Sequence, residues 1–290
     1  MFNLSFESMG THWQVSVDVE QLPQNVITDI FEQTNQFDQQ YSRFISTSEA
    51  NKFRHAQQGE YEISETLAMM LQAGQRISIL SDGAFDVSVA TLFEEIGYDQ
   101  DYNFGKAPKT IEWKPPKWSV HKTILITDGP IVFDVGGIGK GYWIDQISNI
   151  LKKHKFMNHL VEGGGDMFGT QKRDGSPWQV AIEYPGKPDT AIGIVGLQNQ
   201  GLAVSDIFKR AWKNWHHLVN ASTGKPVSSM LGNAAISSST FLADQMTSCL
   251  SFAPAENYAE IASELKAEYL IVNADATLQV SDDWKGELFY

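Results

Sequence analysis

Asp244 and Ser248 form the first pair of residues whose types and spacing could support chemistry. They stand four positions apart, so a helix would present a carboxylate and a hydroxyl on one face. Oxygen ligands of this kind suit Mg2+, which usually completes its coordination shell with water and phosphate. An ordinary hydrogen bond within the helix explains the same spacing, and it is the simpler interpretation when the pair is taken alone.

Two glycine-rich segments could line a ligand site. The first, at 134–141, reads Asp-Val-Gly-Gly-Ile-Gly-Lys-Gly. Glycines let a ligand approach the backbone closely, and amides at a helix start attract phosphate. The dinucleotide-binding spacing is missing, and Gly141 follows the lysine where a P-loop needs Ser or Thr. A tight turn explains this segment about equally well, and a turn is the better explanation for Glu-Gly-Gly-Gly-Asp at 162–166.

The neighbouring histidines His216 and His217 could supply a base or a metal ligand. On a strand, adjacent side chains point to opposite faces, so the two could not both bind one metal ion from that strand. One of them could face a site while the other is exposed or packed. A single histidine is more often structural than catalytic, so a catalytic role for either residue needs support from the surrounding sequence.

Composition excludes several classes of protein. The 290 residues carry 22 Lys plus Arg and 35 Asp plus Glu, a net charge of −13, which argues against a broad nucleic-acid surface. The single cysteine, Cys249, excludes a disulfide framework and multi-cysteine metal sites. No apolar run approaches the roughly 18 residues of a membrane span. The first residues lack the basic and apolar segments of a signal peptide, so we expect a cytoplasmic protein.

The elements that must position these residues follow from hydrophobic spacing and turn signals. Helices and strands are mixed, and short hairpin connections outnumber strand–helix–strand units, so we expect an α+β fold with mostly antiparallel sheets. Residues 1–290 should form a single domain, or two lobes dividing near 100–120, where a long connection with little regular structure is expected. Expected helices are 26–39, about 64–80 capped by Ser64 and Gly83, one that follows Gly141 and ends in the cations of 152–155, roughly 240–252, and one near 256–266. Expected strands are 13–18, 158–162, 178–184, 192–197, 202–205 and 269–272, with a hairpin of 123–127 and 131–133 around Asp128-Gly129-Pro130.

In their order along the chain, these segments resemble the ApbE family, the FAD:protein FMN transferases. Each motif is weak, but the series is specific and runs from residue 9 to about 252. The matching segments are Met9-Gly10-Thr11, Ser42-Arg43-Phe44, Ser48-Glu49, Gly83-Ala84-Phe85-Asp86, 134–145, Gly164-Gly165-Asp166, 217–224 and 243–250.

The resemblance implies a T-fold-like architecture with a flavin cleft and an Mg2+-dependent enzyme. Such an enzyme moves FMN from FAD onto a Thr or Ser hydroxyl of an acceptor flavoprotein and releases AMP. The family's acceptors share a motif Asp-Gly-x-Ser/Thr-Gly-Ala-Ser/Thr. Membrane insertion and nucleic-acid binding are not expected.

Site residues carry over position by position. His217 would be the general base, and Asp244 would serve both catalysis and metal binding. The metal ligands would be Gly137, Asp244, Thr247 and Ser248. The contacts to FAD would come from Met9, Phe44, Ala84, Phe85, Asp86, Asp134, Lys140 and Leu218.

Several positions depart from the family pattern. Asn220-Ala221 replaces an Asp-Pro pair, and Asp206 stands where glycine is usual. The family's asparagine near the first flavin contact aligns with Arg54, or with Asn51 if the register slips. Two other functions therefore stay open: an FAD pyrophosphatase that yields FMN and AMP, and a non-catalytic FAD-binding protein.

Overall fold

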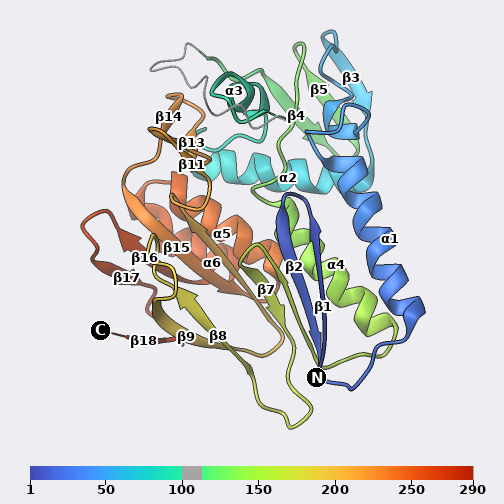
Figure 1. Ribbon diagram of the computed structural model, residues 1–290. Helices are drawn as coiled ribbons and strands as arrows, with labels where there is room; N and C mark the ends of the chain where they lie inside the picture. The colour runs from blue at the N-terminus through green and yellow to red at the C-terminus, as the bar shows by residue number, and fades with distance from the viewer. Residues whose placement is uncertain (100–112, 290) are drawn as a thin grey trace.

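An eight-stranded antiparallel sheet forms the centre of the computed structural model, which describes residues 1–99 and 113–289 (Figure 1). Strands from before and after residues 100–112 share this sheet. In spatial order its strands are β1 (Phe2–Ser8), β2 (Thr11–Val17), β6 (His159–Gly163), β7 (Asp166–Gly169), β10 (Gln200–Asp206), β15 (Met230–Ser237), β16 (Glu268–Asn273) and β17 (Leu278–Val280). The expected α+β fold with mostly antiparallel sheet is confirmed.

Helices cover one face of this sheet. Helices α4 (Gly139–Lys153) and α5 (Thr240–Phe252) pack against each other and against the central strands (Figure 1). Next to them lie α1 (Gln24–Tyr41), α2 (Glu65–Leu80) and α6 (Tyr258–Leu265). Helix α3 (Ala90–Glu95) packs in a separate apolar cluster, and two short 3-10 helices span Glu49–Asn51 and Ala255–Asn257.

A small sheet covers the opposite face. It consists of β8 (Trp178–Glu183), β9 (Ala191–Leu197) and β18 (Glu287–Leu288). Because successive side chains of a strand point to opposite faces, β15 contributes to both cores. Ala234 and Ile236 pack with β8 and β9, whereas Ala235 packs with the helices.

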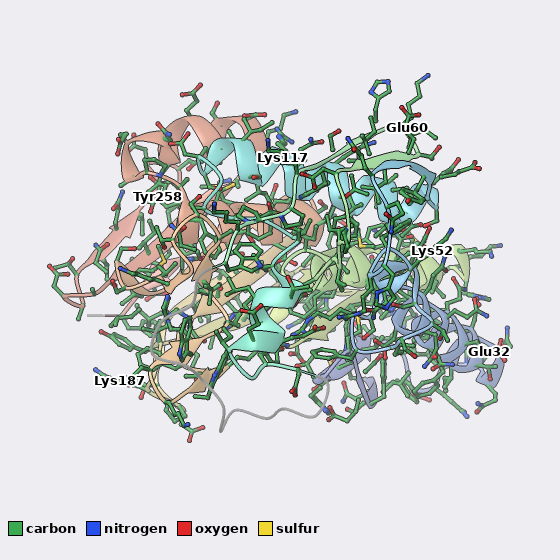
Figure 2. All side chains as sticks on the ribbon, turned by 90° about the horizontal axis from the view of Figure 1, so that it is seen from above. Glu32, Lys52, Glu60, Lys117, Lys187 and Tyr258 are labelled. Carbon is green, nitrogen blue, oxygen red and sulfur yellow. The ribbon has the colours of Figure 1, made fainter. Side chains whose placement is uncertain are left out.

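Three further small sheets complete the structure. One has the order β3 (Gly59–Glu62), β5 (Ile124–Thr127), β4 (Trp118–His121). The others pair β11 (Ala211–Trp212) with β12 (Trp215–His216), and β13 (Val219–Asn220) with β14 (Lys225–Pro226). Charged side chains such as Glu32, Lys52 and Glu60 lie at the periphery, as expected for solvated groups (Figure 2). No helix in the described ranges is long and apolar enough to span a membrane.

The sequence predicted the boundaries of α2 well. The hydroxyl of Ser64 accepts a hydrogen bond from the Leu67 amide, which is the expected N-cap, and the helix ends at Leu80. Gly83 follows with φ of +76°, a left-handed conformation that suits glycine.

The predicted hairpin around Asp128-Gly129-Pro130 is wrong. Strand β5 pairs with β3 and β4, and 131–133 forms no strand. The amides of Ile131 and Phe133 instead donate to the carbonyls of Phe53 and Ala50. This extended apolar segment therefore finds its partners in a distant turn. Within the predicted connection at 99–120, residues 100–112 lie outside the described residues, and β4 begins at Trp118.

Candidate functional site

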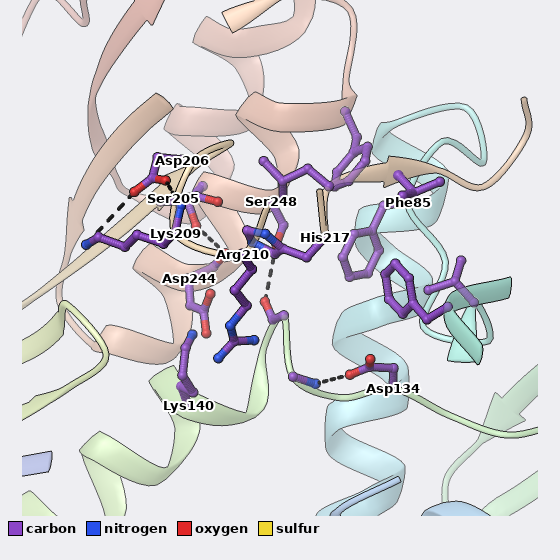
Figure 3. Close-up of a pocket in the computed structure, with 18 of the residues that line it drawn as sticks. Phe85, Asp134, Lys140, Ser205, Asp206, Lys209, Arg210, His217, Asp244 and Ser248 are labelled. Atoms are coloured by element: carbon purple, nitrogen blue, oxygen red, sulfur yellow. Dashed lines mark hydrogen bonds and ion pairs between the residues drawn. The ribbon is translucent and has the colours of Figure 1, made fainter. Parts of the chain in front are cut away.

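A cleft lies between the α4–α5 pair and the chain that connects β10 to β15 (Figure 3). The space between its walls, part of it open to solvent, measures about 1010 Å³. One end, around Lys140, Lys209, Arg210 and Asp244, is charged, and Phe85 lies toward the other (Figure 3). The charged and polar lining residues include Lys140, Lys209, Arg210, Asp244 and Ser248, and the aromatic and aliphatic ones include Phe85, Phe93, Tyr98, Leu218 and Phe252.

Helices α4 and α5 are locked together beside the charged end. Both carboxylate oxygens of Asp145, on α4, accept hydrogen bonds from the first amides of α5, at Thr240 and Phe241, each at 3.0 Å. The Gly141 amide donates to the Asp244 carboxylate at 3.1 Å. A Cβ on Gly141 would lie 2.7 Å from the Thr240 carbonyl oxygen, so this close crossing requires glycine.

All four predicted metal ligands line the cleft, and three of them offer an oxygen that is not committed to a contact within α5. The Ser248 hydroxyl lies 3.3 Å from the Gly137 carbonyl oxygen, and Asp244 lies one helical turn away. The Thr247 hydroxyl instead donates to the Asp244 carbonyl within α5, at 2.9 Å. A carboxylate, a hydroxyl and a carbonyl are oxygen donors that fit Mg2+. No group of three His, Cys, Asp or Glu side chains placed to hold a metal ion occurs within residues 1–99 and 113–289.

The Asp244 carboxylate is buried with incomplete charge compensation. Burial raises the pKa of Asp244 to about 7, and the Lys140 ammonium opposes this shift. A cation bound beside Asp244 would favour its ionised form. The donor set therefore suits a divalent cation that keeps its remaining ligands from water or a phosphate.

Lys140 is held by Asp166. Its ammonium lies 2.7 Å from one Asp166 oxygen, and the other oxygen accepts the Val204 amide at 3.0 Å. Burial alone would lower the pKa of Lys140, but the carboxylates of Asp166 and Asp244 raise it above its usual value. Lys140 is therefore a fixed cation within the cleft wall.

The two histidines have different environments. His216 is buried, its Nε2 donates to the Val227 carbonyl at 2.9 Å, and its Nδ1 accepts the Leu218 amide at 3.2 Å. His217 lines the cleft, and its buried Nδ1 has no hydrogen-bond partner in the described structure. Burial, with a contribution from the Arg210 charge, lowers the pKa of His217 to about 3. The imidazole is therefore neutral at neutral pH.

The predicted flavin contacts fall into two groups. Five of them line the cleft: Phe85, Asp86, Asp134, Lys140 and Leu218. The other three, Met9, Phe44 and Ala84, lie outside that lining, although the Ala84 carbonyl accepts the Ala221 amide at 2.8 Å and so supports the wall.

Two of the lining carboxylates are engaged by the protein. Asp134 accepts Arg43 Nε at 2.7 Å and the Gly136 amide at 2.8 Å. Asp86 accepts the Ser88 amide and the Trp118 indole, and burial raises its pKa. Both carboxylates thus hold nearby backbone amides, at Gly136 and Ser88, in place along the cleft.

The structure explains two departures from the family pattern. The side-chain oxygen of Asn220 accepts the amides of Ser222 and Thr223, so asparagine supplies the acceptor that aspartate would. Asn51 is buried and donates to the carbonyls of Arg43 and Ile45, on either side of Phe44. Arg54 pairs instead with Glu94 at 2.7 Å. Asn51 therefore positions the backbone near the predicted first flavin contact.

Arg210 is the main cleft residue that the sequence did not single out as a site residue. It lies in the turn after β10 and reaches the charged end of the cleft (Figure 3). Its only sequence signal was its place in Ser-Asp-Ile-Phe-Lys-Arg at 205–210, which resembles a family segment without indicating a role.

Comparisons with known proteins agree with this architecture. The solved structure of the ApbE protein of Thermotoga maritima superposes with a TM-score of 0.83 at 22% identity, covering 97% of both chains. The flavin transferase ApbE of Vibrio cholerae gives a TM-score of 0.84 at 21% identity, covering 98% of both. These likenesses show the fold.

Sequence comparison identifies the family. The chain belongs to the ApbE family, whose model matches residues 9–271. The FAD:protein FMN transferase of Haemophilus influenzae is 26% identical, over 95% of this chain and 87% of the relative. The enzyme of the same name from Salmonella typhimurium is 25% identical, over 82% and 74%.

Proposed function

We propose that the protein is an Mg2+-dependent FAD:protein FMN transferase with a T-fold-like architecture. The observation that carries the proposal is one cleft with an apolar, aromatic end beside a charged, oxygen-rich end, in a chain whose curated relatives have this activity. An isoalloxazine needs an apolar aromatic environment, and a pyrophosphate needs cations. FAD contains both groups.

Mg2+ would be held by the Asp244 carboxylate, the Ser248 hydroxyl and the Gly137 carbonyl. When bound, it neutralises charge on the pyrophosphate of FAD. The α4–α5 pair fixes the backbone that carries these three groups, through Asp145 and Gly141. The flavin would occupy the end lined by Phe85 and Leu218.

The transfer step exchanges one phosphorus–oxygen bond for another. The hydroxyl oxygen of an acceptor Thr or Ser forms a bond to the phosphorus of the FMN half. The bond from that phosphorus to the bridging oxygen breaks, and AMP leaves with the electron pair. His217 accepts the hydroxyl proton, because its imidazole is neutral and lines the cleft. The anionic substrate beside His217 would raise the pKa of this imidazole and make it a stronger base.

The test measures AMP release from FAD and Mg2+ with and without a flavoprotein that carries the acceptor motif. We expect AMP only with the acceptor, together with an acceptor mass increased by one FMN residue. Replacing the acceptor hydroxyl by alanine should remove the adduct. AMP without acceptor would identify a pyrophosphatase instead, and flavin binding without AMP would identify a non-catalytic binding protein.

The cellular location is part of the proposal. We propose a cytoplasmic enzyme that modifies an acceptor facing the cytoplasm, where FAD and Mg2+ are both present. Cell fractionation with an antibody to the protein tests this, and recovery outside the cytoplasm would overturn it.

A further inference from the structure

Arg210 differs from the other cations of the cleft in having no carboxylate partner within the described ranges. Lys140 pairs with Asp166 at 2.7 Å, and Lys209 lies 3.9 Å from Asp206. The one hydrogen bond of the Arg210 guanidinium in this part of the chain goes from Nη1 to the Tyr98 hydroxyl, at 3.4 Å. A guanidinium carries five donors, so most of them have no protein partner within the described ranges.

Lys140 already shares its charge with a carboxylate of the protein. Main-chain pairing between β7 and β10 ends at Met167 and Leu202, and beyond it the Asp166 carboxylate accepts the Val204 amide. Asp166 is thus fixed by the sheet and holds the Lys140 ammonium with its other oxygen. Moving Lys140 toward a ligand would break this ion pair in a buried environment, which is costly.

The position of Arg210 suits an anion. Its guanidinium projects into the space between Lys140 and Asp134, at the charged end that also holds Asp244 and Ser248 (Figure 3). Two capping hydrogen bonds hold the turn that carries it, because the Asp206 carboxylate accepts the amides of Phe208 and Lys209, each at 2.8 Å. The loop and the Tyr98 hydroxyl together aim the guanidinium before any ligand binds.

We propose that Arg210 binds the pyrophosphate of the flavin nucleotide through its guanidinium, with Tyr98 as the residue that positions it. This inference rests on the proposed function, because it takes FAD as the ligand. A planar guanidinium can bind two phosphate oxygens at once, which an ammonium cannot do. Arg210 would thereby stabilise the negative charge that moves onto AMP when the pyrophosphate bond breaks, while Lys140 stays in the cleft wall.

The experiment compares three flavins that differ in phosphate content. FAD, FMN and riboflavin are titrated by flavin fluorescence against the wild-type protein, Arg210→Gln, Arg210→Lys and Tyr98→Phe. Arg173→Gln serves as the matched control, because it removes the same charge from an exposed turn outside the cleft. Thermal unfolding of each variant checks that it is folded, and AMP release with acceptor is measured in parallel.

Arg210→Gln should weaken FAD and FMN binding by roughly 10–100-fold, the scale of a lost charge-assisted hydrogen bond, and leave riboflavin binding unchanged. Arg210→Lys should lose less affinity for FAD and FMN, because lysine keeps the positive charge but cannot bind two phosphate oxygens with a planar guanidinium. Tyr98→Phe should show a smaller loss with the same preference for phosphate-bearing ligands. Arg173→Gln should bind all three as the wild type does.

Two results would overturn this inference and leave the proposed function standing. Equal losses for riboflavin, FMN and FAD in both Arg210 variants would make Arg210 a structural residue, and unchanged FAD binding would remove it from the site. If Arg210→Gln does not fold, Arg210→Lys gives the same comparison. If the wild type binds FAD in an Arg210-dependent way but transfers no FMN, the proposed function fails and the inference stands. If the wild type binds no flavin nucleotide, both fail.

Discussion

The Ser248 hydroxyl of α5 lies 3.3 Å from the carbonyl oxygen of Gly137, in the turn that precedes α4. Two oxygen atoms from positions 111 residues apart are thus neighbours before any ligand is bound. Because the Asp145 carboxylate caps α5, the approach of these two oxygens is enforced by the packing of whole helices. Predictions about the site therefore concern both its side chains and the helices beneath them.

Asp244→Asn should abolish Mg2+-dependent AMP release and leave the protein folded. The variant keeps an acceptor for the Gly141 amide but loses the one carboxylate among the predicted metal ligands. Ser248→Ala should have a milder effect, because water can replace a neutral hydroxyl ligand. Initial rates at increasing Mg2+ concentration measure both variants. An active Asp244→Asn enzyme that needs no Mg2+ would place the metal site elsewhere.

His217→Gln should lower kcat for FMN transfer by about 10²–10⁴-fold, the usual contribution of a general base. Binding of FAD should change little, since the imidazole acts on the acceptor proton. His216→Gln is the comparison, because His216 is buried and hydrogen-bonded to the backbone. This variant should have a lower free energy of unfolding, whereas kcat per folded molecule should change little. Single-turnover transfer and FAD titration separate these effects, and equal rates for wild type and His217→Gln would disprove the assignment.

Gly141→Ala should separate α4 from α5 and disable the site. The added Cβ would lie 2.7 Å from both the Thr240 carbonyl oxygen and the Asp244 Cβ, and a backbone atom cannot move aside cheaply. We expect a loss of about 1–3 kcal/mol in the free energy of unfolding and a weaker dependence on Mg2+. Gly129→Ala, which would meet nothing within 4 Å, is the control. Chemical denaturation and Mg2+-dependent rates measure the outcome.

Phe85→Leu should weaken binding of both FAD and FMN. Phe85 lines the cleft, so losing its ring removes a stacking surface worth about 1–3 kcal/mol. Phe44→Leu should have a smaller effect, because the Arg43 guanidinium lies 4.0 Å from its ring centroid and Phe44 is not part of the lining. Fluorescence titration measures both, and a larger loss at Phe44 would place the isoalloxazine against that ring.

The unfolding free energy should fall as the pH drops from about 6.5 to about 4, in part because of His159. Burial lowers the pKa of His159 from 6.5 to about 4, so the unfolded chain binds this proton first. The contribution is complete above pH 6.5 and is lost on the way down to pH 4, by about 3 kcal/mol. His159→Gln should flatten this part of the pH dependence, whereas the same change at exposed His121 should not. Denaturant unfolding at several pH values tests this, and parallel curves for wild type and His159→Gln would contradict it.

Sequence patterns predicted elements whose signals are local. Helix α5 was predicted at 240–252 and occupies Thr240–Phe252, since its cap and its apolar spacing are adjacent in sequence. Strand β15 was missed because Gly232, Asn233, Ala234 and Ala235 lack the branched side chains typical of strands. Its central place in the sheet comes from pairing with β10 and β16, which no local pattern encodes.

The candidate site shows the same limit. Family motifs brought Asp244, Ser248 and Gly137 to attention, and the structure brings all three to one cleft. Those motifs did not indicate that Lys140 forms an ion pair with Asp166, or that Arg210 has no carboxylate partner in the described part of the chain. Both properties depend on contacts between distant segments. Pairing of charges across the fold decides which cation is available to a ligand.

The cleft draws its groups from distant parts of the chain. Gly137, Lys140, Asp244 and Ser248 belong to the α4–α5 region, whereas Arg210, His217 and Leu218 lie on the connection between β10 and β15. This connection enters and leaves through paired strands of the central sheet, so its sequence can change while its two ends stay fixed. Segment 207–229 is also anchored to the opposite wall, where the Ala221 amide donates to the Ala84 carbonyl. A substitution in this segment that leaves the anchor and the two strand ends intact should therefore perturb the proposed nucleotide contacts while the helices beneath the proposed metal ligands stay in place.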